Sequence, residues 1–218
     1  MPRLLFEKTG NAVWISHLDL MRLFQRSFKR AGLALKHSQG YSPRPYVAVA
    51  LPLSVGVESC CELLDFDLEG DAVPNDEIRD RLNNALTEGV RVLEVYDEGA
   101  KIKHLALLDC TVTLEYDGGV PAEADASIRE LFSREGLTVE KKGKNGPTQQ
   151  DIIPMIRRIQ VTAGEREIEL RALVCCQNPS LNPMQLAAAV TRYLPELAPD
   201  HARSRRIEIY DQNEQVFR

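Results

Sequence analysis

Apolar residues in the first half of the chain recur at two spacings, which predict alternating strands and helices. From Leu20 to Ala31 the apolar positions have helical spacing, and Gly32 ends the run. Ser16, followed three positions later by Asp19, is a start signal for this helix. Elsewhere the pattern predicts a second helix over residues 74–86 and strands over residues 3–8, 46–53, 58–68 and 90–96. This βαββαβ order is that of a ferredoxin-like unit.

The second half of the chain repeats this order with one extra strand. The pattern predicts helices over residues 124–135 and 182–194 and strands over residues 107–116, 137–141, 153–162, 167–175 and 206–210. The polar segment 142–151 contains two glycines and a proline and is expected to form a loop. We therefore predict an α+β fold of two tandem ferredoxin-like (βαββαβ) units with antiparallel sheets, over residues 1–98 and 105–218. A single larger mixed sheet is the alternative.

Charge is distributed unevenly along the chain. The whole sequence carries a net charge of −5, but residues 1–50 hold eight basic and two acidic side chains. The remainder therefore carries −11. A basic segment on an acidic protein favours a localised anionic partner over indiscriminate binding to polyanions.

Composition narrows the class of protein. The sequence contains no apolar run of about 18 residues, so no membrane-spanning segment is expected. The five cysteines include two adjacent pairs and no C-x-x-C motif, a pattern typical of reduced thiols, and the first residues do not resemble a secretory signal. We expect a cytoplasmic protein with no bound metal and no cofactor.

The first predicted helix carries a cationic face. Arg22, Arg26, Lys29 and Arg30 lie at offsets of 0, 4, 7 and 8 residues, which places them opposite the apolar stripe. The non-functional interpretation is that this face is solvated, or that its cations pair with acidic residues from the second half of the chain. The functional interpretation is contact with phosphates, because few acids are interleaved.

The segment after this helix is rich in hydrogen-bond donors. Pro43, Pro45 and Gly40 restrict its backbone. A stiff loop loses little entropy on binding, although an ordinary structural loop is the alternative. The candidate nucleic-acid contacts in this segment are Lys36, His37, Arg44 and Tyr41, whose ring offers a stacking surface for a base.

Three weaker candidates accompany these residues. His17 and His37 flank the basic segment and are weak candidates for a general acid and base in RNA cleavage, although a packing role is more typical of a histidine at a helix start. Asp65 and Asp67 share one face of a strand, where a solvated surface is more typical than a metal site. The third is a basic cluster near the C-terminus, for which a solvated strand start is the alternative: Arg203, Arg205 and Arg206.

The stretch ISHLDLMRLFQRSFKRAGL, followed by SQGYSPRP and ALPLSVGVES, resembles the bacterial radical SAM-linked domain family of unknown function. Residues 15–57 carry nearly all of the resemblance. Tyr41 and Ser42 depart from it, since the family has Phe and Asn there. The second half resembles the family only in its length and in Asn182-Pro183 before its last helix.

The resemblance implies a context more than an activity. Such domains are encoded beside, or fused to, a radical S-adenosylmethionine (SAM) protein, and sometimes near genes of the ribonuclease E/G type. This chain has no cysteine triplet spaced for an iron–sulfur cluster, so radical chemistry would belong to a partner.

Three functions remain open from the sequence. The first is a non-catalytic RNA-binding or substrate-presenting partner of a radical SAM enzyme that modifies tRNA or rRNA. The second is a protein-interaction module that docks on that enzyme without nucleic acid. The third, by analogy with the tandem ferredoxin-like repeat-associated proteins of CRISPR systems (RAMPs), is a metal-independent endoribonuclease.

Overall fold

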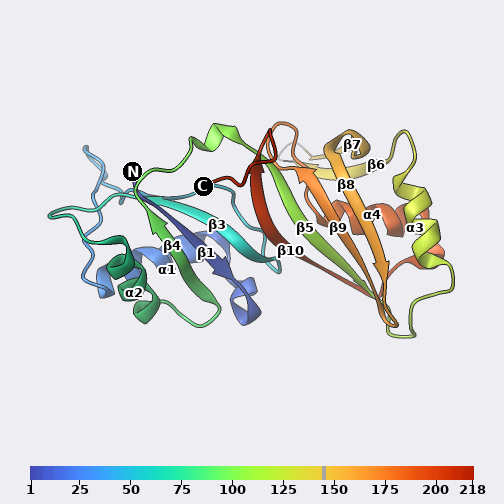
Figure 1. The fold of residues 1–218 in the computed structure, drawn as a ribbon, viewed down its shortest axis with the longest axis horizontal. Helices are drawn as coiled ribbons and strands as arrows, with labels where there is room; N and C mark the ends of the chain where they lie inside the picture. The colour runs from blue at the N-terminus through green and yellow to red at the C-terminus, as the bar shows by residue number, and fades with distance from the viewer. Residues whose placement is uncertain (144–145) are drawn as a thin grey trace. The chain divides into compact units, whose positions relative to one another are not determined.

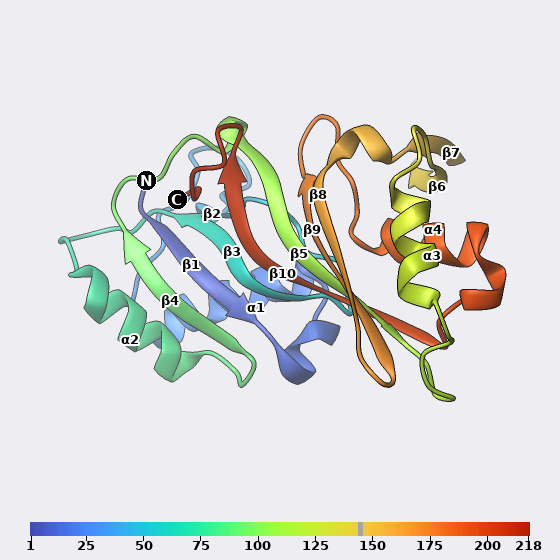
Figure 2. The same cartoon turned by 45° about the vertical axis from the view of Figure 1, so that its right-hand side comes forward.

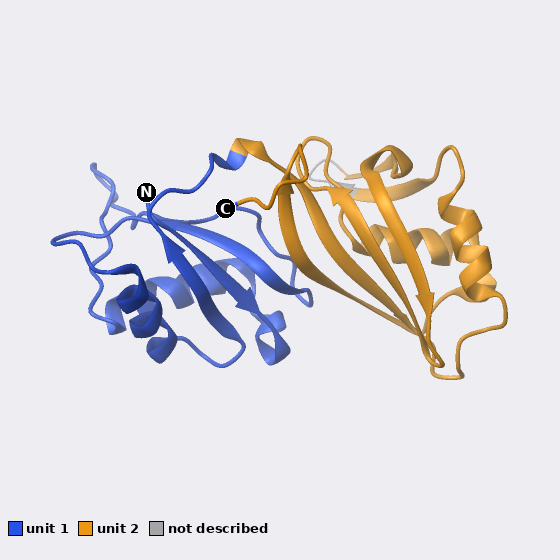
Figure 3. Ribbon diagram, in the orientation of Figure 1, with its two compact units in different colours: residues 1–102, 218 blue, residues 103–217 orange. Residues whose placement is uncertain are grey.

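The structure is a computed structural model that describes residues 1–143 and 146–218. The chain divides into two compact units, shown in different colours in Figure 3. Unit 1 comprises residues 1–102 together with Arg218, and unit 2 comprises residues 103–217. Each unit is described by itself below.

Unit 1 contains four antiparallel strands and two long helices (Figure 1). The strands pair in the order β4-β1-β3-β2. Its elements are β1 (Arg3–Lys8), the 3-10 helix η1 (Gly10–Trp14), α1 (His17–Arg30), β2 (Val47–Val49), β3 (Glu58–Phe66), α2 (Asn75–Ala85) and β4 (Val90–Tyr96). The predicted βαββαβ order of this half is therefore present.

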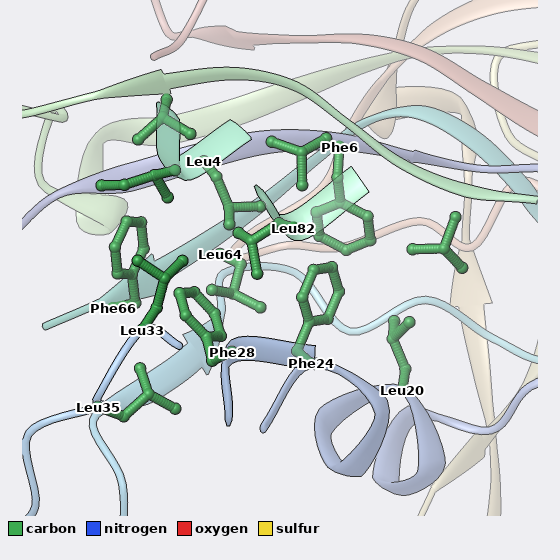
Figure 4. Close-up of a cluster of buried hydrophobic side chains, with 14 of the residues drawn as sticks. Leu4, Phe6, Leu20, Phe24, Phe28, Leu33, Leu35, Leu64, Phe66 and Leu82 are labelled. Carbon is green, nitrogen blue, oxygen red and sulfur yellow. The ribbon is translucent and has the colours of Figure 1, made fainter. Parts of the chain in front are cut away.

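Both helices of unit 1 pack on the same face of its sheet. The core cluster contains alternate residues of each long strand, such as Leu4 and Phe6 of β1. Since alternate residues of a strand point to one face, the helices must cover that face. Figure 4 shows the aromatic rings of Phe24 and Phe28 pointing into this cluster from α1. The Phe6 and Phe24 rings meet edge to face at 4.8 Å between centroids, a favourable aromatic arrangement.

The start of α1 is fixed from two sides. Ser16 caps the helix, because its hydroxyl oxygen accepts a hydrogen bond from the backbone N–H of Asp19 at 3.2 Å. Lys8 is buried, and its ammonium donates to the carbonyl oxygens of Val13 and Ile15, at 3.1 and 2.8 Å. These bonds hold the segment that leads into the helix and thereby set the direction in which α1 leaves the sheet.

The strand β2 is shorter than the sequence pattern predicted. A strand over residues 46–53 was expected, but only Val47–Val49 pairs with β3. Pro45 and Pro52 flank this segment and have no N–H to donate to a strand partner, which limits the ladder between them.

In unit 2 four long strands pair antiparallel in the order β10-β5-β9-β8. The helices α3 and α4 of this unit contact these strands (Figure 2). The elements are the 3-10 helix η2 (Ile102–His104, which begins at the last residue of unit 1), β5 (Leu105–Glu115), α3 (Ala124–Phe132), β6 (Thr138–Gly143), β7 (Gly146–Asp151), η3 (Ile153–Met155), β8 (Ile156–Ala163), β9 (Glu167–Cys175), α4 (Met184–Tyr193), η4 (Pro195–Leu197) and β10 (His201–Asp211).

Two predictions for unit 2 were wrong in extent. The expected loop over residues 142–151 contains strand β7, which pairs with β6 from Thr138 opposite Asp151 onward, while residues 144–145 lie outside the described residues. The last strand begins at His201, well before the expected residue 206, because His201 to Arg206 pair with β5. The α+β class with antiparallel strands is confirmed.

Candidate nucleic-acid interface

The exposed face of α1 carries four basic residues in different environments. Arg22 forms an exposed ion pair with Asp19, at 3.0 Å between Nη1 and Oδ1. Hydrogen bonds from the Ser16 hydroxyl and, second in size of effect, from Arg22 stabilise the Asp19 carboxylate and hold its pKa below the usual value. An exposed pair of this kind is weak, so Arg22 can exchange Asp19 for another anion at little cost.

Arg30 points away from this group, toward α2. Its guanidinium donates to the carbonyl oxygen of Ala85 at 2.5 Å and to the hydroxyl of Ser27 at 3.1 Å. Ala85 is the last residue of α2, where carbonyl oxygens have no partner within the helix. Arg30 therefore joins the ends of the two helices and has a structural role.

Arg26 and Lys29 lie on the exposed face of α1, and neither side chain has an ion pair or hydrogen bond among the described residues. Arg26 lies four residues after Arg22, and Lys29 lies three residues after Arg26. The three cations therefore form one stripe along the helix, which is called the α1 stripe below.

The loop after α1 is closed by hydrogen bonds between its two arms. The backbone N–H of Ser38 donates to the carbonyl of Arg44 at 2.9 Å, and the N–H of Tyr46 donates to the carbonyl of Lys36 at 2.8 Å. The hydroxyl of Ser38 also accepts from the N–H of Arg44. Tyr41 lies between these arms and is fully exposed, at 107% of its reference area.

The basic residues of this loop are partly available. Lys36 forms an exposed ion pair with Asp67, at 3.2 Å. Arg44 is exposed, and no partner for its side chain is present within residues 1–143 and 146–218. His37 is exposed and lines a pocket of about 670 Å³ together with Lys29. The loop therefore adds a free guanidinium and an exposed aromatic ring to unit 1.

The structure does not bring the two histidines together. His17 is the first residue of α1, whereas His37 lines a pocket beside Gly32, after the helix has ended. A helix of 14 residues is about 20 Å long at 1.5 Å per residue. Two groups at opposite ends of it cannot act together as acid and base on one phosphate.

The other sequence candidates have partners inside the protein. Asp65 pairs with the buried Arg3 at 2.5 Å, and Asp67 pairs with Lys36, so both carboxylates balance cations. Arg203 pairs with Glu115 on the neighbouring strand β5 and with Glu167 on β9, one strand further along the sheet of unit 2. Arg205 and Arg206 also interact with other residues.

Exposed apolar residues near the start of α1 were missed by the sequence analysis. Trp14 is 70% exposed and Leu18 is 66% exposed, and the Trp14 ring lies over Gly56. Leu18 precedes Arg22 by one helical turn, so it continues the α1 stripe. The signal in the sequence was an apolar residue on the polar side of the helical pattern.

Comparison with known proteins identifies a family. Residues 2–183 match the family described as an uncharacterized protein conserved in bacteria (DUF2344), and the chain belongs to this family. No curated protein matches the chain. None of the helices in the part of the chain that the structure describes is long and apolar enough to cross a membrane.

Solved structures show a similar fold at low sequence identity. A chain of the crystal structure of a Cbf5-Nop10-Gar1 complex is 10% identical, with a TM-score of 0.52 over 95% of this chain. A chain of the archaeal box H/ACA sRNP Nop10-Cbf5 complex is also 10% identical, with a TM-score of 0.46 over 94% of this chain. The chain spans about half the length of these structures, 48% and 46%. At this identity the likeness to the first shows the fold alone.

Proposed function

We propose that this chain is a non-catalytic RNA-binding component that presents tRNA or rRNA to a radical SAM enzyme. Unit 1 binds the RNA backbone through the α1 stripe and Arg44, and Tyr41 stacks on a base. The radical SAM partner is inferred from the family resemblance of residues 15–57, and binding to RNA is inferred from the arrangement of charges. The two parts of the proposal can therefore be tested separately.

We also infer that both units are ferredoxin-like repeats. The strand order β4-β1-β3-β2 of unit 1 corresponds to β10-β5-β9-β8 of unit 2 when each unit is numbered from its own first strand and β6 and β7 are left out of the numbering. In unit 2 the β6–β7 hairpin is an insertion between α3 and β8. This correspondence supports the tandem arrangement, and the likeness to the Cbf5-complex chain supports the same fold class.

The observation that carries the RNA proposal is the set of cations without internal partners. Arg26, Lys29 and Arg44 remain unpaired in the described chain, although the protein has a net charge of −5. Acids are numerous enough to neutralise them, as Asp19 and Asp67 do for Arg22 and Lys36. Surfaces that bind single-stranded nucleic acid combine exposed cations with exposed aromatic rings, and unit 1 carries both.

The salt dependence of RNA binding tests this proposal. If three phosphates are neutralised, log affinity should fall against log salt with a slope of about −2 for single-stranded RNA. Reversing two charges of the α1 stripe, in Arg26→Glu with Lys29→Glu, should abolish most of the binding. The matched control is Arg91→Glu with Arg157→Glu, which reverses two exposed cations on β4 and β8. If both double variants lost the same amount of RNA affinity, the loss would be explained by net charge alone, and the proposed interface would be refuted.

A second function is favoured by the exposed Trp14 and Leu18. Large exposed apolar residues are typical of protein interfaces, so this end of α1 is a candidate docking surface for the radical SAM enzyme. Co-purification of that enzyme that survives nuclease treatment, and that is lost in Leu18→Glu, would support docking without nucleic acid. Loss of co-purification on nuclease treatment would instead support an RNA bridge.

A further inference from the structure

A pocket of about 670 Å³ lies beside the C-terminal end of α1, entirely within unit 1. Its volume is within the range of small-molecule sites and exceeds what one nucleobase requires. Apolar residues from the segment after the helix lie beside polar side chains from three parts of the chain. The residues used below are Gln25, Lys29, Leu33, Leu35, His37 and Glu69.

Glu69 is the unexpected residue in this pocket. Its backbone N–H donates to the carbonyl of Ala34 at 2.8 Å, which holds it against the segment that follows α1. Its carboxylate is exposed, and no cation or donor pairs with it among the residues described. A carboxylate repels phosphate, so a ligand that fits this pocket has to offer hydrogen-bond donors to Glu69 as well as acceptors to Lys29.

Lys29 supplies the opposite chemistry in the same pocket. Its ammonium has three donors, and Gln25, one turn earlier on α1, adds an amide that both donates and accepts. Leu33 and Leu35 are largely buried and give the pocket an apolar surface, while the exposed imidazole of His37 provides a flat ring. The pocket therefore suits a planar ligand with donors on one edge and acceptors on another.

We propose that this pocket binds a guanine base splayed out of single-stranded RNA. Guanine has two adjacent donors, N1–H and the N2 amine, which a carboxylate can accept together, and its O6 and N7 accept from lysine. Adenine, cytosine and uracil each present an acceptor beside their donor on the corresponding edge, and that acceptor would face the Glu69 carboxylate. Guanine is thus the base that satisfies Glu69 and Lys29 at the same time.

This inference rests on the proposed function, because it adds base selectivity to the same RNA-binding surface. Arg22, Arg26 and Arg44 would hold the three phosphates, while Lys29 contacts the base, and the phosphate contacts carry no sequence information. Glu69 would then be the specificity-determining residue. The two claims predict different observables: phosphate contacts set the salt slope, and Glu69 sets the preference among bases.

The experiment measures fluorescence anisotropy of the full chain with labelled oligouridine, either uniform or carrying one central guanosine, adenosine or inosine. We expect the guanosine oligonucleotide to bind about tenfold more tightly than the adenosine one. Inosine lacks the N2 amine and should lie between them. Glu69→Gln should remove the preference for guanosine. Asp71→Asn makes the same charge change two residues away, outside the pocket, and should keep the preference.

The outcomes separate the two proposals. Binding of all oligonucleotides with one affinity would leave the RNA-binding function standing and overturn the guanine pocket. A preference for guanosine that survives in Glu69→Gln would also overturn it. If none of the oligonucleotides binds the wild-type protein, the proposed function fails and the inference fails with it.

Discussion

Arg26 and Arg30 lie one turn apart on α1, in different environments. Arg26 is exposed and forms no hydrogen bond or direct ion pair in the described chain, although its charge also acts on Asp19, whereas the guanidinium of Arg30 donates to the carbonyl of Ala85 at the end of α2. Replacing each residue by alanine should therefore separate RNA binding from stability. We expect Arg26→Ala to weaken binding and Arg30→Ala to weaken the fold.

The magnitudes follow from these contacts. Arg30→Ala removes the hydrogen bonds that a charged and exposed donor makes to Ala85 and Ser27, which we expect to lower the free energy of unfolding by about 1 kcal/mol. In a protein of this size such a loss lowers Tm by about 2–4 °C. Arg26→Ala should change the free energy of unfolding by less than about 0.5 kcal/mol. Losing one phosphate contact should reduce affinity for single-stranded RNA about fivefold at 0.1 M salt.

The assays are thermal unfolding and an RNA titration at several salt concentrations, with both variants in each assay. Arg26→Ala should make the salt slope less steep by about 0.7, while Arg30→Ala should leave the slope unchanged. Arg30→Lys is a useful control, because it keeps the charge and alters the geometry of the bond to Ala85. An equal effect of Arg26→Ala and Arg30→Ala on RNA affinity would refute the assignment of Arg30 to structure.

Two further predictions concern unit 1 and unit 2 separately. Gly89→Ala should destabilise unit 1 by about 1 kcal/mol or more, measured by urea unfolding. A methyl group at this position would lie 2.5 Å from the carbonyl oxygen of Thr9, and the backbone has a φ of +82°, which disfavours alanine. Stability equal to that of the wild type would contradict the described turn. Burial raises the pKa of the Cys110 thiol from 9.0 to about 12, so the unfolded thiol ionises first, and stability should fall as pH rises between these values. Cys110→Ser should reduce that fall in alkaline urea titrations, and an identical pH dependence in the variant would refute the role of this thiol.

The sequence pattern predicted most helices and strands of the fold, because caps and the spacing of apolar residues lie within each element. The start of α1 depends on Ser16 and Asp19, three residues apart, and its buried face depends on spacing within the helix. The strands β1 and β4 were predicted with the bounds that the structure shows, Arg3–Lys8 and Val90–Tyr96, because both are short segments rich in apolar residues. The structure of such elements is determined mainly by their own residues.

Elements defined by their partners were predicted poorly. β7 has the sequence GPTQQD, which is typical of a loop, and it is a strand because it pairs with β6. The first residues of β10 include Arg203, whose side chain pairs with Glu115 on the neighbouring strand β5 and with Glu167 on the strand after it, β9. A pairing between residues this far apart leaves no periodic trace in either segment.

The candidate site shows the same division between local and distant information. Helical spacing correctly placed Arg22, Arg26 and Lys29 on one exposed face. Spacing could not show that Arg30 turns to the end of α2, or that Asp67 returns to pair with Lys36. A cluster of basic residues in a sequence is therefore an upper limit on the cations available to a partner. Under the proposed function, the interface is the subset that folding leaves without an ion pair or hydrogen bond. One member of that subset, Lys29, lines a pocket together with Glu69, whose carboxylate also lacks a partner in the described chain.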